Sequence, residues 1–312
     1  MKTLGVVYGF KKGKWIKHTT DDLLSKLKFA FGERNIAVVK VGLLDSRVEI
    51  RSNKLVMRDA KTKQSYRDLD GVYIANWRLA PEIAMALAKY MTSRKKAVLN
   101  GEILHFPAVS KLGEMVLMAN KSIPMPDSFF VRNKYLQSMV KQQKLPAGFD
   151  FPLIVKSVVG SMGADNWLVK SFADLDAIVS VDRDDMLVVQ QFIPNDFDYR
   201  VLVFGGSVRA VIKRSRLDQA ATHLNNTSAG ALGEMIDLVD FPDYLKTIAL
   251  SAAKATKRSD LAGVDIIIDS TNGNPYVLEV NKSPQIETGS NVDIKTRIFV
   301  EYAQERIAKN DK

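Results

Sequence analysis

Two apolar strands that carry charged residues decide the fold, within the stretch GVDIIIDSTNGNPYVLEVNKSP at residues 263–284. Side chains alternate between the two faces of a strand, so Glu279 and Asn281 lie on one face. Burying an unpaired carboxylate is costly, so Asp265 and Glu279 need either a bound cation or a salt bridge. Oxygen ligands of this kind suit magnesium, which proteins usually hold with one or two carboxylates together with nucleotide phosphates. We therefore predict a metal site at Asp265, Glu279 and Asn281, with a structural ion pair as the alternative.

A second signal is a small glycine loop, VVGSMGA at residues 158–164, which follows a strand that carries Lys156. Glycines let backbone N–H groups approach a phosphate closely, and a neighbouring lysine adds positive charge. Neither a Walker A sequence nor G-x-G-x-x-G occurs in the chain, so this loop is the candidate phosphate site. The alternatives are an ordinary tight turn and a solvated lysine at a strand end.

The third signal is a hairpin, RVLVFGGSVRAVIKR at residues 200–214, which follows Asp198 closely. A two-residue turn at its Gly-Gly pair places Asp198 opposite Lys213, so that Asp198, Arg200 and Lys213 share a face. Arg214 then points to the other face unless a bulge intervenes, and which of the two basic residues meets a phosphate stays open. The alternative is a cross-strand ion pair with no part in binding.

Hydrophobic periodicity predicts an α/β lobe over residues 1–105. Its first helix is predicted to begin at Asp21, behind a Thr20 cap, and to end at Gly32. The other elements predicted for this lobe are strands at 3–9, 36–43, 71–77 and 97–100, a hairpin at 48–59 and a helix at 81–94. Those predicted beyond it are helices at 110–120, 173–179 and 245–253 and from Val292, and strands at 128–131, 153–158, 186–193, 264–269 and 276–281, besides the hairpin.

Composition excludes several classes of protein. The chain of 312 residues has no cysteine and only three histidines, so disulfides and a zinc ribbon are excluded. It shows no signal peptide and no apolar run long enough for a membrane span, and we expect a cytoplasmic protein. The net charge is +10, and residues 1–67 hold sixteen Lys or Arg against six Asp or Glu. This one-sided charge favours an anionic partner such as an acidic peptide, a phosphorylated substrate or a nucleic acid, and a solvated basic face is the alternative.

The order of these pieces resembles the ATP-grasp superfamily, and within it the RimK-like branch, bacterial ligases that add glutamate to a ribosomal protein. The resemblance runs from about Asp70 to the C-terminus, through GVYIANWRL, AVLN, SKLGEMVLMANKSIPMPDSFFV, QQFI, the Asp-x-Arg hairpin, GVD and EVN. It implies an N-terminal α/β lobe followed by a two-lobed ATP-grasp domain. The central lobe is then expected over 106–186, and the C-terminal lobe with the metal site over 187–312.

The resemblance also implies roles for single residues. Lys111 and Lys156 are expected to contact the nucleotide phosphates, and the loop of Gly160, Ser161, Met162 and Gly163 is expected to fold over them. Adenine is expected to be lined by Gln190, Gln191, Phe192 and Ile193. Asp198 is expected to bind the ribose. The γ-phosphate and an acyl phosphate are expected at Arg200, Lys213 or Arg214, and Asn226. The cofactors implied are ATP with Mg²⁺ or Mn²⁺ at Asp265, Glu279 and Asn281. The activity implied is an ATP-dependent joining of a carboxylate to an amine through an acyl phosphate, with release of ADP and phosphate.

The sequence departs from the pattern of the branch at three places. Gln191 stands where Glu is common, RLDQAATHLNN lacks an Arg shortly before the Asn and brings His223 nearby, and SPQIETG replaces an SPG turn. The last two places are where we expect the carboxylate and amine substrates, so an unusual substrate is expected, and an acidic peptide or protein is one candidate. A non-catalytic nucleotide- or nucleic-acid-binding protein that uses the basic lobe is the alternative, although the chain has no recognised nucleic-acid motif. The oligomeric state is open, with a homo-oligomer plausible.

Overall fold

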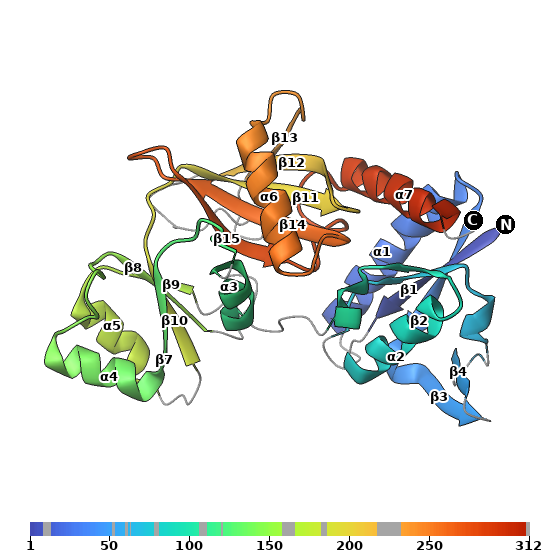
Figure 1. The fold of residues 1–312 in the computed structure, drawn as a ribbon, viewed down its shortest axis with the longest axis horizontal. Helices are drawn as coiled ribbons and strands as arrows, with labels where there is room; N and C mark the ends of the chain where they lie inside the picture. The colour runs from blue at the N-terminus through green and yellow to red at the C-terminus, as the bar shows by residue number, and fades with distance from the viewer. Residues whose placement is uncertain are drawn as a thin grey trace.

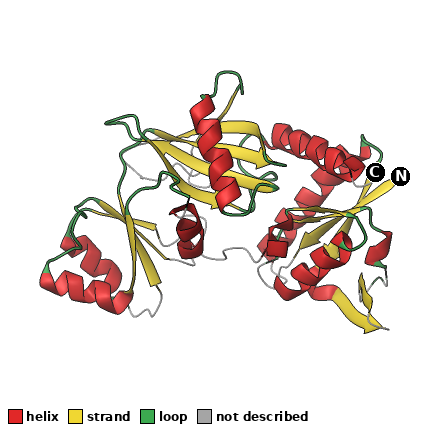
Figure 2. Cartoon of the chain, in the orientation of Figure 1, coloured by secondary structure: helices red, strands yellow, loops and turns green. Residues whose placement is uncertain are grey.

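The computed structural model describes residues 1–8, 14–51, 54–59, 62, 64–77, 81–105, 111–119, 121–157, 166–181, 186–216 and 232–309. The chain forms three lobes, and the C-terminal lobe lies between the other two (Figure 1). Helices cover the sheets of all three lobes (Figure 2). Among the described helices, none is long and apolar enough to cross a membrane.

The N-terminal lobe has a four-stranded parallel sheet of order β2-β1-β5-β6. Its strands are β1 (Lys2–Tyr8), β2 (Ile36–Gly42), β5 (Gly71–Ile74) and β6 (Ala97–Leu99), its helices are α1 (Lys14–Gly32) and α2 (Pro81–Thr92), and β3 (Ser46–Arg51) pairs with β4 (Lys54–Asp59) as a hairpin. Neighbouring residues of β1 face opposite layers, because Val6 packs with the α1 side and Val7 with the α2 side. The predicted α/β lobe is therefore confirmed.

One helix boundary in this lobe was predicted wrongly. We expected Thr20 to cap a helix that begins at Asp21, but α1 begins at Lys14 and runs through both residues. Nothing between Lys14 and Thr20 breaks a helix, since that segment contains neither glycine nor proline, and threonine lowers helix propensity only slightly. The predicted end at Gly32 is confirmed.

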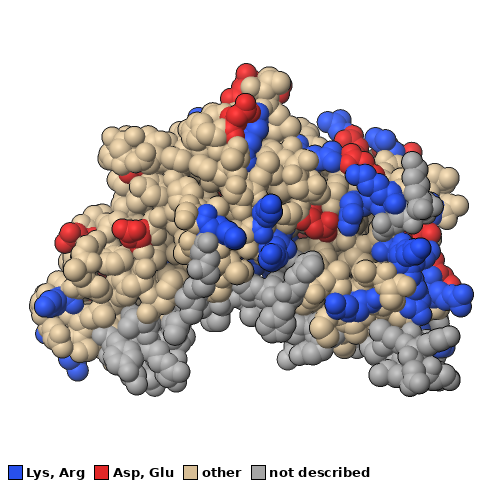
Figure 3. Space-filling model, viewed as in Figure 1, with Lys and Arg blue, Asp and Glu red and all other residues tan. Residues whose placement is uncertain are grey.

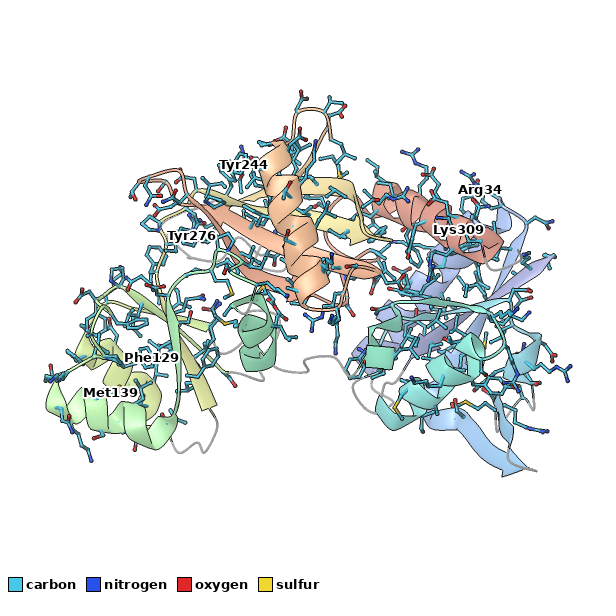
Figure 4. The ribbon with its side chains drawn as sticks, in the orientation of Figure 1. Arg34, Phe129, Met139, Tyr244, Tyr276 and Lys309 are labelled. Carbon is cyan, nitrogen blue, oxygen red and sulfur yellow. The ribbon has the colours of Figure 1, made fainter. Side chains whose placement is uncertain are left out.

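The central lobe has an antiparallel sheet of order β7-β10-β8-β9, covered on one face by two helices. Its elements are β7 (Ser128–Arg132), α4 (Asn133–Gln142), β8 (Leu153–Ser157), β9 (Asn166–Val169), α5 (Phe172–Val179) and β10 (Met186–Gln191). Figure 4 shows Phe129 of β7 and Met139 of α4 in this lobe, and both pack against its buried core. The boundary expected between residues 186 and 187 falls at the start of β10, and we propose to place it after Gln191, because all of β10 pairs with β7 and β8.

The C-terminal lobe has a five-stranded antiparallel sheet of order β13-β12-β11-β14-β15. Its strands are β11 (Phe197–Phe204), β12 (Ser207–Ser215), β13 (Leu232–Ile236), β14 (Leu261–Ile268) and β15 (Pro275–Asn281), and its helices are α6 (Asp243–Ala255) and α7 (Val292–Lys309). Helix α3 (Lys111–Ala119) also packs here, against α6 and β15. One face of β11 buries Val201 and Val203 under α6, and the other buries Leu202 and Phe204 against α7 and the N-terminal lobe.

A carboxylate ties the N-terminal lobe to the C-terminal lobe. Asp260, just before β14, accepts the backbone N–H of Asn100 at 2.5 Å and that of Gly101 at 3.2 Å. Its other oxygen accepts the hydroxyl of Tyr302 on α7. The amide of Asn100 donates in turn to the carbonyl of Lys282, at 3.2 Å. The carboxyl edge of the parallel sheet, where open α/β sheets bind ligands, therefore faces the residues that follow β15.

Candidate active site between the central and C-terminal lobes

A ladder of alternating charges crosses the C-terminal sheet. Arg200 on β11 lies opposite Asp265 on β14 and donates to both oxygens of its carboxylate, with Nη2 2.9 Å from Oδ2. Arg214 on β12 donates to Asp198 at 2.6 and 2.7 Å, and its Nη2 also lies 3.1 Å from Asp265. All four side chains are buried. Each guanidinium is thus held by at least one carboxylate before any ligand arrives.

A β-bulge decides which basic residue joins this ladder. At its tip the hairpin turns through Gly205 and Gly206, with φ of +61° and +77°, values that glycine adopts without strain. The pairing then shifts, because Val203 lies opposite Val208 but Leu202 lies opposite Ala210, which leaves Arg209 as an extra residue. Every residue of β12 beyond the bulge is therefore displaced by one position.

The displacement corrects one prediction about the register of the hairpin. Arg214, not Lys213, lies opposite Asp198, so the expectation that Lys213 shares the face of Asp198 and Arg200 is wrong. The ammonium of Lys213 lies 4.3 Å from the centre of the Phe197 ring. The arginine on the ladder can offer a bidentate fork to a carboxylate or phosphate, which a lysine cannot.

Burial and ion pairing act differently on the two aspartates. Burial raises the pKa of Asp198 to about 6, although the guanidinium of Arg214 opposes the shift. Burial also disfavours the charged form of Asp265, but Arg200 and Arg214 together outweigh it and hold the pKa of Asp265 below its ordinary value. Asp265 is therefore the firmly ionised member of the ladder, and it carries the charge that both arginines share.

The glycine of the GVD motif makes room for this contact. A Cβ atom on Gly263 would lie 2.9 Å from Cδ of Arg200 and 3.2 Å from the backbone of Pro284. The first contact is closer than real Cβ atoms accept, and the second is tighter than most of them. Only glycine at this position allows the Arg200 side chain to cross β14 and reach Asp265.

The three residues predicted as metal ligands come together as expected from strand alternation. Glu279 lies opposite Asp265, and the amide of Asn281 donates to Oδ2 of Asp265 at 3.2 Å. In the part of the chain that the structure describes, the half-buried carboxylate of Glu279 has no hydrogen-bond or ion-pair partner. A carboxylate without a direct partner among the described residues, beside a second carboxylate and an amide oxygen, is a donor set that fits Mg²⁺.

This donor set does not amount to a complete protein cage. Over the described ranges, no group of three or more His, Asp or Glu side chains is placed to hold a metal ion. Magnesium usually completes its octahedron with water and substrate phosphates. The geometry thus fits an ion that arrives with a nucleotide.

A lysine of the central lobe, Lys156, lies near the proposed metal ligands. Lys156 on β8 donates to Oε1 of Gln190 on β10 at 3.0 Å, and Gln190 donates onward to the hydroxyl of Ser128 at 3.0 Å. Burial lowers the pKa of Lys156 to about 8, with the charge of Glu279 opposing this shift and that of Lys111 reinforcing it. Lys111, Lys156 and the carboxylates of the C-terminal lobe therefore act on one another across the space between the lobes.

The two glutamines of QQFI point in different directions. Gln190 faces Lys156, whereas the amide of Gln191 donates to the carbonyls of Asp150 and Pro152, at 3.1 and 3.3 Å. Adjacent residues of a strand face opposite sides, so only Gln190 joins Lys156. Phe192 and Ile193 follow β10 and are half-buried. The predicted residues Gly160, Ser161, Met162, Gly163 and Asn226 lie outside the described residues.

Sequence reasoning missed a buried ion pair beside the metal ligands. Glu114 on α3 accepts from Arg258 at 2.5 Å and from the backbone N–H of Val280 at 2.6 Å, and Arg258 donates to the carbonyl of Val280. Burial raises the pKa of Glu114 to about 7. A signal was present, because Glu114 is the one charged residue in the apolar run LGEMVLMA and lies three residues after Lys111.

Comparisons with known proteins identify the family of the chain. The RimK-like ATP-grasp domain family matches residues 108–304. A probable alpha-L-glutamate ligase of Legionella pneumophila (strain Corby) is 29% identical over 232 residues, which cover 71% of each chain.

Solved ATP-grasp ligases share the fold at low sequence identity. The ligase PsnB, in complex with minimal precursor, Mg and ADP, superposes with a TM-score of 0.66 at 16% identity over 97% of both chains. Its complex with precursor peptide PsnA2 and AMPPNP gives 0.64 at 15% identity, over 100% of this chain and 97% of PsnB. D-alanine–D-alanine ligase from Bacillus anthracis in complex with ATP gives 0.64 at 17% identity, over 99% and 98%. The resemblance drawn from the sequence is therefore confirmed: the chain belongs to the RimK-like ATP-grasp family and is an ATP-grasp ligase.

Proposed function

We propose that this ligase joins a carboxylate to an amine through an acyl phosphate and uses ATP with Mg²⁺. The observation that carries the proposal is that Lys156, from the central lobe, lies close enough to Glu279 and Asp265, from the C-terminal lobe, for their charges to act on its pKa. A cation on one side and metal-binding carboxylates on the other suit a nucleotide triphosphate between them. The ATP, ADP and Mg in the complexes of D-alanine–D-alanine ligase and PsnB support the same cofactors here.

The side chains divide the work in the proposed reaction. Lys111 and Lys156 bind the nucleotide phosphates under the GSMG loop, while Gln190 to Ile193 line adenine and Asp198 contacts the ribose. Arg200, Arg214 and Asn226 hold the γ-phosphate and the acyl phosphate. Asp265, Glu279 and Asn281 would hold Mg²⁺, which when bound offsets charge on the phosphoryl oxygens.

The bond changes need no side-chain nucleophile. A carboxylate oxygen of the first substrate attacks the γ-phosphorus, and the bond to the β-phosphate oxygen breaks to release ADP. The amine nitrogen then attacks the acyl carbon, forming the carbon–nitrogen bond as phosphate leaves with its electron pair and the nitrogen loses a proton. Catalysis of this kind rests on positioning and on fixed positive charge at the oxygens that become more negative. The buried guanidinium groups of Arg200 and Arg214 are suited to that task.

Glutamate is the first amino acid to test as a substrate, because the Legionella relative is a probable alpha-L-glutamate ligase. We further propose an acidic peptide or protein as the second substrate. Two observations support it: PsnB binds a precursor peptide, and residues 1–67 hold sixteen basic against six acidic residues. Blue Lys and Arg side chains gather over the N-terminal lobe and α7 in Figure 3. An anionic acceptor would be concentrated by such a field.

A screen for ADP release tests both proposals. Purified protein is mixed with ATP, Mg²⁺ and pairwise combinations of amino acids, acidic peptides and matched neutral peptides, and the products are weighed by mass spectrometry. We expect ADP only when a carboxylate and an amine are both present, and a product heavier by one residue with glutamate and an acidic peptide. ADP release that ignores both substrates would contradict the ligase proposal, and equal use of neutral and acidic peptides would contradict the acceptor proposal alone.

A further inference from the structure

On the outer edge of β15, an ion pair forms hydrogen bonds with the backbone of a single residue, Val280. β15 is the edge strand of its sheet, so the backbone groups of Val280 that point away from β14 have no neighbouring strand. Glu114 accepts the N–H of Val280 at 2.6 Å, and Arg258 donates to its C=O. Glu114 and Arg258 also bind each other at 2.5 Å. Both backbone polar groups of one residue, Val280, are thus gripped by the two side chains.

Satisfying the backbone of an edge strand does not require the burial of charged side chains. Earlier on the same edge, the N–H of Val277 is satisfied by a plain backbone bond to the carbonyl of Pro124 at 2.8 Å. At Val280 the chain instead buries two opposite charges, and Glu114 and Arg258 are only 7% and 4% exposed. Buried ion pairs add little to stability over apolar residues of the same shape. A role other than stability is therefore the better explanation.

The gripped residue lies between two of the proposed metal ligands. Glu279 and Asn281 flank Val280, and their side chains point to the face of Asp265. Because β15 has a bulge at Leu278, next to Glu279, pairing with β14 alone fixes this part of the strand weakly. The ion pair restrains the strand from its free side, where sheet pairing cannot.

We propose that Glu114 and Arg258 are positioning residues that hold β15 at Val280 and thereby aim Glu279 and Asn281 at the metal. The inference rests on the proposed function, because it assumes that these two side chains bind Mg²⁺ with a nucleotide. Neither positioning residue touches the nucleotide or the reacting atoms in this account. Outer partners of metal ligands commonly change metal affinity by about 10- to 100-fold when they are lost.

Calorimetry of ADP binding over a range of Mg²⁺ concentrations tests the inference in the full chain. Glu114→Gln keeps an acceptor for Val280 but loses the ion pair. The double variant Glu114→Met with Arg258→Met removes the grip and takes away both charges of this ion pair together, so we expect it to fold. The control is Glu305→Gln, which breaks the exposed pair between Arg209 and Glu305 at 2.6 Å in the same lobe. Hydrogen exchange at the amide of Val280 reports the grip directly.

We expect the Mg²⁺ concentration that half-saturates ADP binding to rise about tenfold in the double variant and less in Glu114→Gln, with faster exchange at Val280. ADP affinity without Mg²⁺ and the Glu305→Gln control should stay as in the wild type, an outcome that a merely structural role would not produce. Unchanged Mg²⁺ dependence in the folded double variant overturns the inference alone. If the wild type binds no ADP at any Mg²⁺ concentration, the proposed function fails and the inference fails with it.

Discussion

The sheets of the central and C-terminal lobes present charge in two different ways. In the C-terminal sheet, Arg200 and Arg214 are each bound by an aspartate and are fixed in place. In the central sheet, Lys156 is held by the neutral amide of Gln190, and its pKa is lowered to about 8 by burial. Paired charges keep a geometry without a ligand, whereas a buried cation with a neutral partner is still available to an anion. The C-terminal lobe thus supplies a rigid frame, the ladder of two arginines and two aspartates. The central lobe supplies Lys156, a cation that is still able to pair with an anionic ligand.

The largest expected effect is the loss of stability when the ladder of charges is broken at Asp265. Asp265→Asn leaves two buried guanidinium groups without their shared counter-charge, and we expect a loss of about 3–5 kcal/mol in the free energy of unfolding. Urea denaturation of Asp265→Asn and of Asp243→Asn, an exposed aspartate paired with Lys246, provides the comparison. Similar small shifts in both variants would show that the ladder does not stabilise the lobe.

A substitution of Glu279 tests metal binding separately from stability, because the carboxylate of Glu279 is not part of the ladder. We expect Glu279→Gln to lower ATP turnover on the order of 10²- to 10³-fold, comparable to the loss of one fixed electrostatic group. Its unfolding free energy should change by less than about 0.5 kcal/mol. Steady-state ADP release and urea denaturation measure the two quantities, with Glu234→Gln on β13 as the control. Turnover at the wild-type rate would remove Glu279 from the site.

On the central lobe, Lys156→Ala should leave the frame intact and weaken the binding of nucleotide. We expect a loss of about 1–3 kcal/mol in ATP binding, the range for a hydrogen bond to a charged group. Calorimetry with ATP measures it, and Lys170→Ala, an exposed lysine of the same lobe, is the control. An ATP affinity equal to that of the wild type would exclude Lys156 as a phosphate ligand.

The lowered pKa of Lys156 also predicts how nucleotide binding depends on pH. Below about pH 8 the ammonium is charged and binds phosphate, and above that value the free protein increasingly carries a neutral amine. ATP affinity should therefore be flat below pH 8 and fall by up to about tenfold for each pH unit above it. In Lys156→Arg the guanidinium stays charged, so the fall should disappear. The same break near pH 8 in both proteins would assign it to another group.

The smallest expected effect comes from Lys213, which the bulge turns away from the ladder. Lys213→Ala removes a cation–π contact with Phe197, and we expect changes in stability and ATP affinity below about 1 kcal/mol. Arg214→Ala should cost several times more in the same urea and calorimetry experiments, because it strips Asp198 and Asp265 of a buried partner. Equal effects of the two substitutions would contradict the observed register.

Much of the fold could be predicted because it depends on local sequence patterns. The open α/β sheet, the hairpin at Gly205 and Gly206 and the two strands that carry Asp265 and Glu279 all follow from periodicity and turn residues. The bulge at Arg209 could not be predicted, since no glycine or other special residue marks it and only packing on both faces of β12 selects the register. Among the α-helices and strands of the described residues, three were missed altogether, α4, β9 and β13.

The missed part of the site has a different physical cause. Glu114 and Arg258 are 144 positions apart, and no periodic pattern connects residues at that separation. Their partner is the backbone of Val280, whose polar groups are the same in every residue type except proline and so leave no trace in the sequence. By contrast, Asp265, Glu279 and Asn281 could be singled out because charged and amide side chains stand out in apolar strands.

The shared core beneath α7 bears on how the chain folds as it is synthesised. Leu4, Val6 and Leu27 of the first lobe pack in one cluster with Phe299 and Ala303 of the last helix. Contacts that span almost the whole sequence slow folding, because a long loop must close before they form. Without α7, the first hundred residues therefore leave exposed the part of this cluster that α7 covers, although α1 packs on the same face of the sheet. We expect this lobe expressed alone to aggregate or to recruit chaperones, and the native protein to assemble only after its last helix has been released.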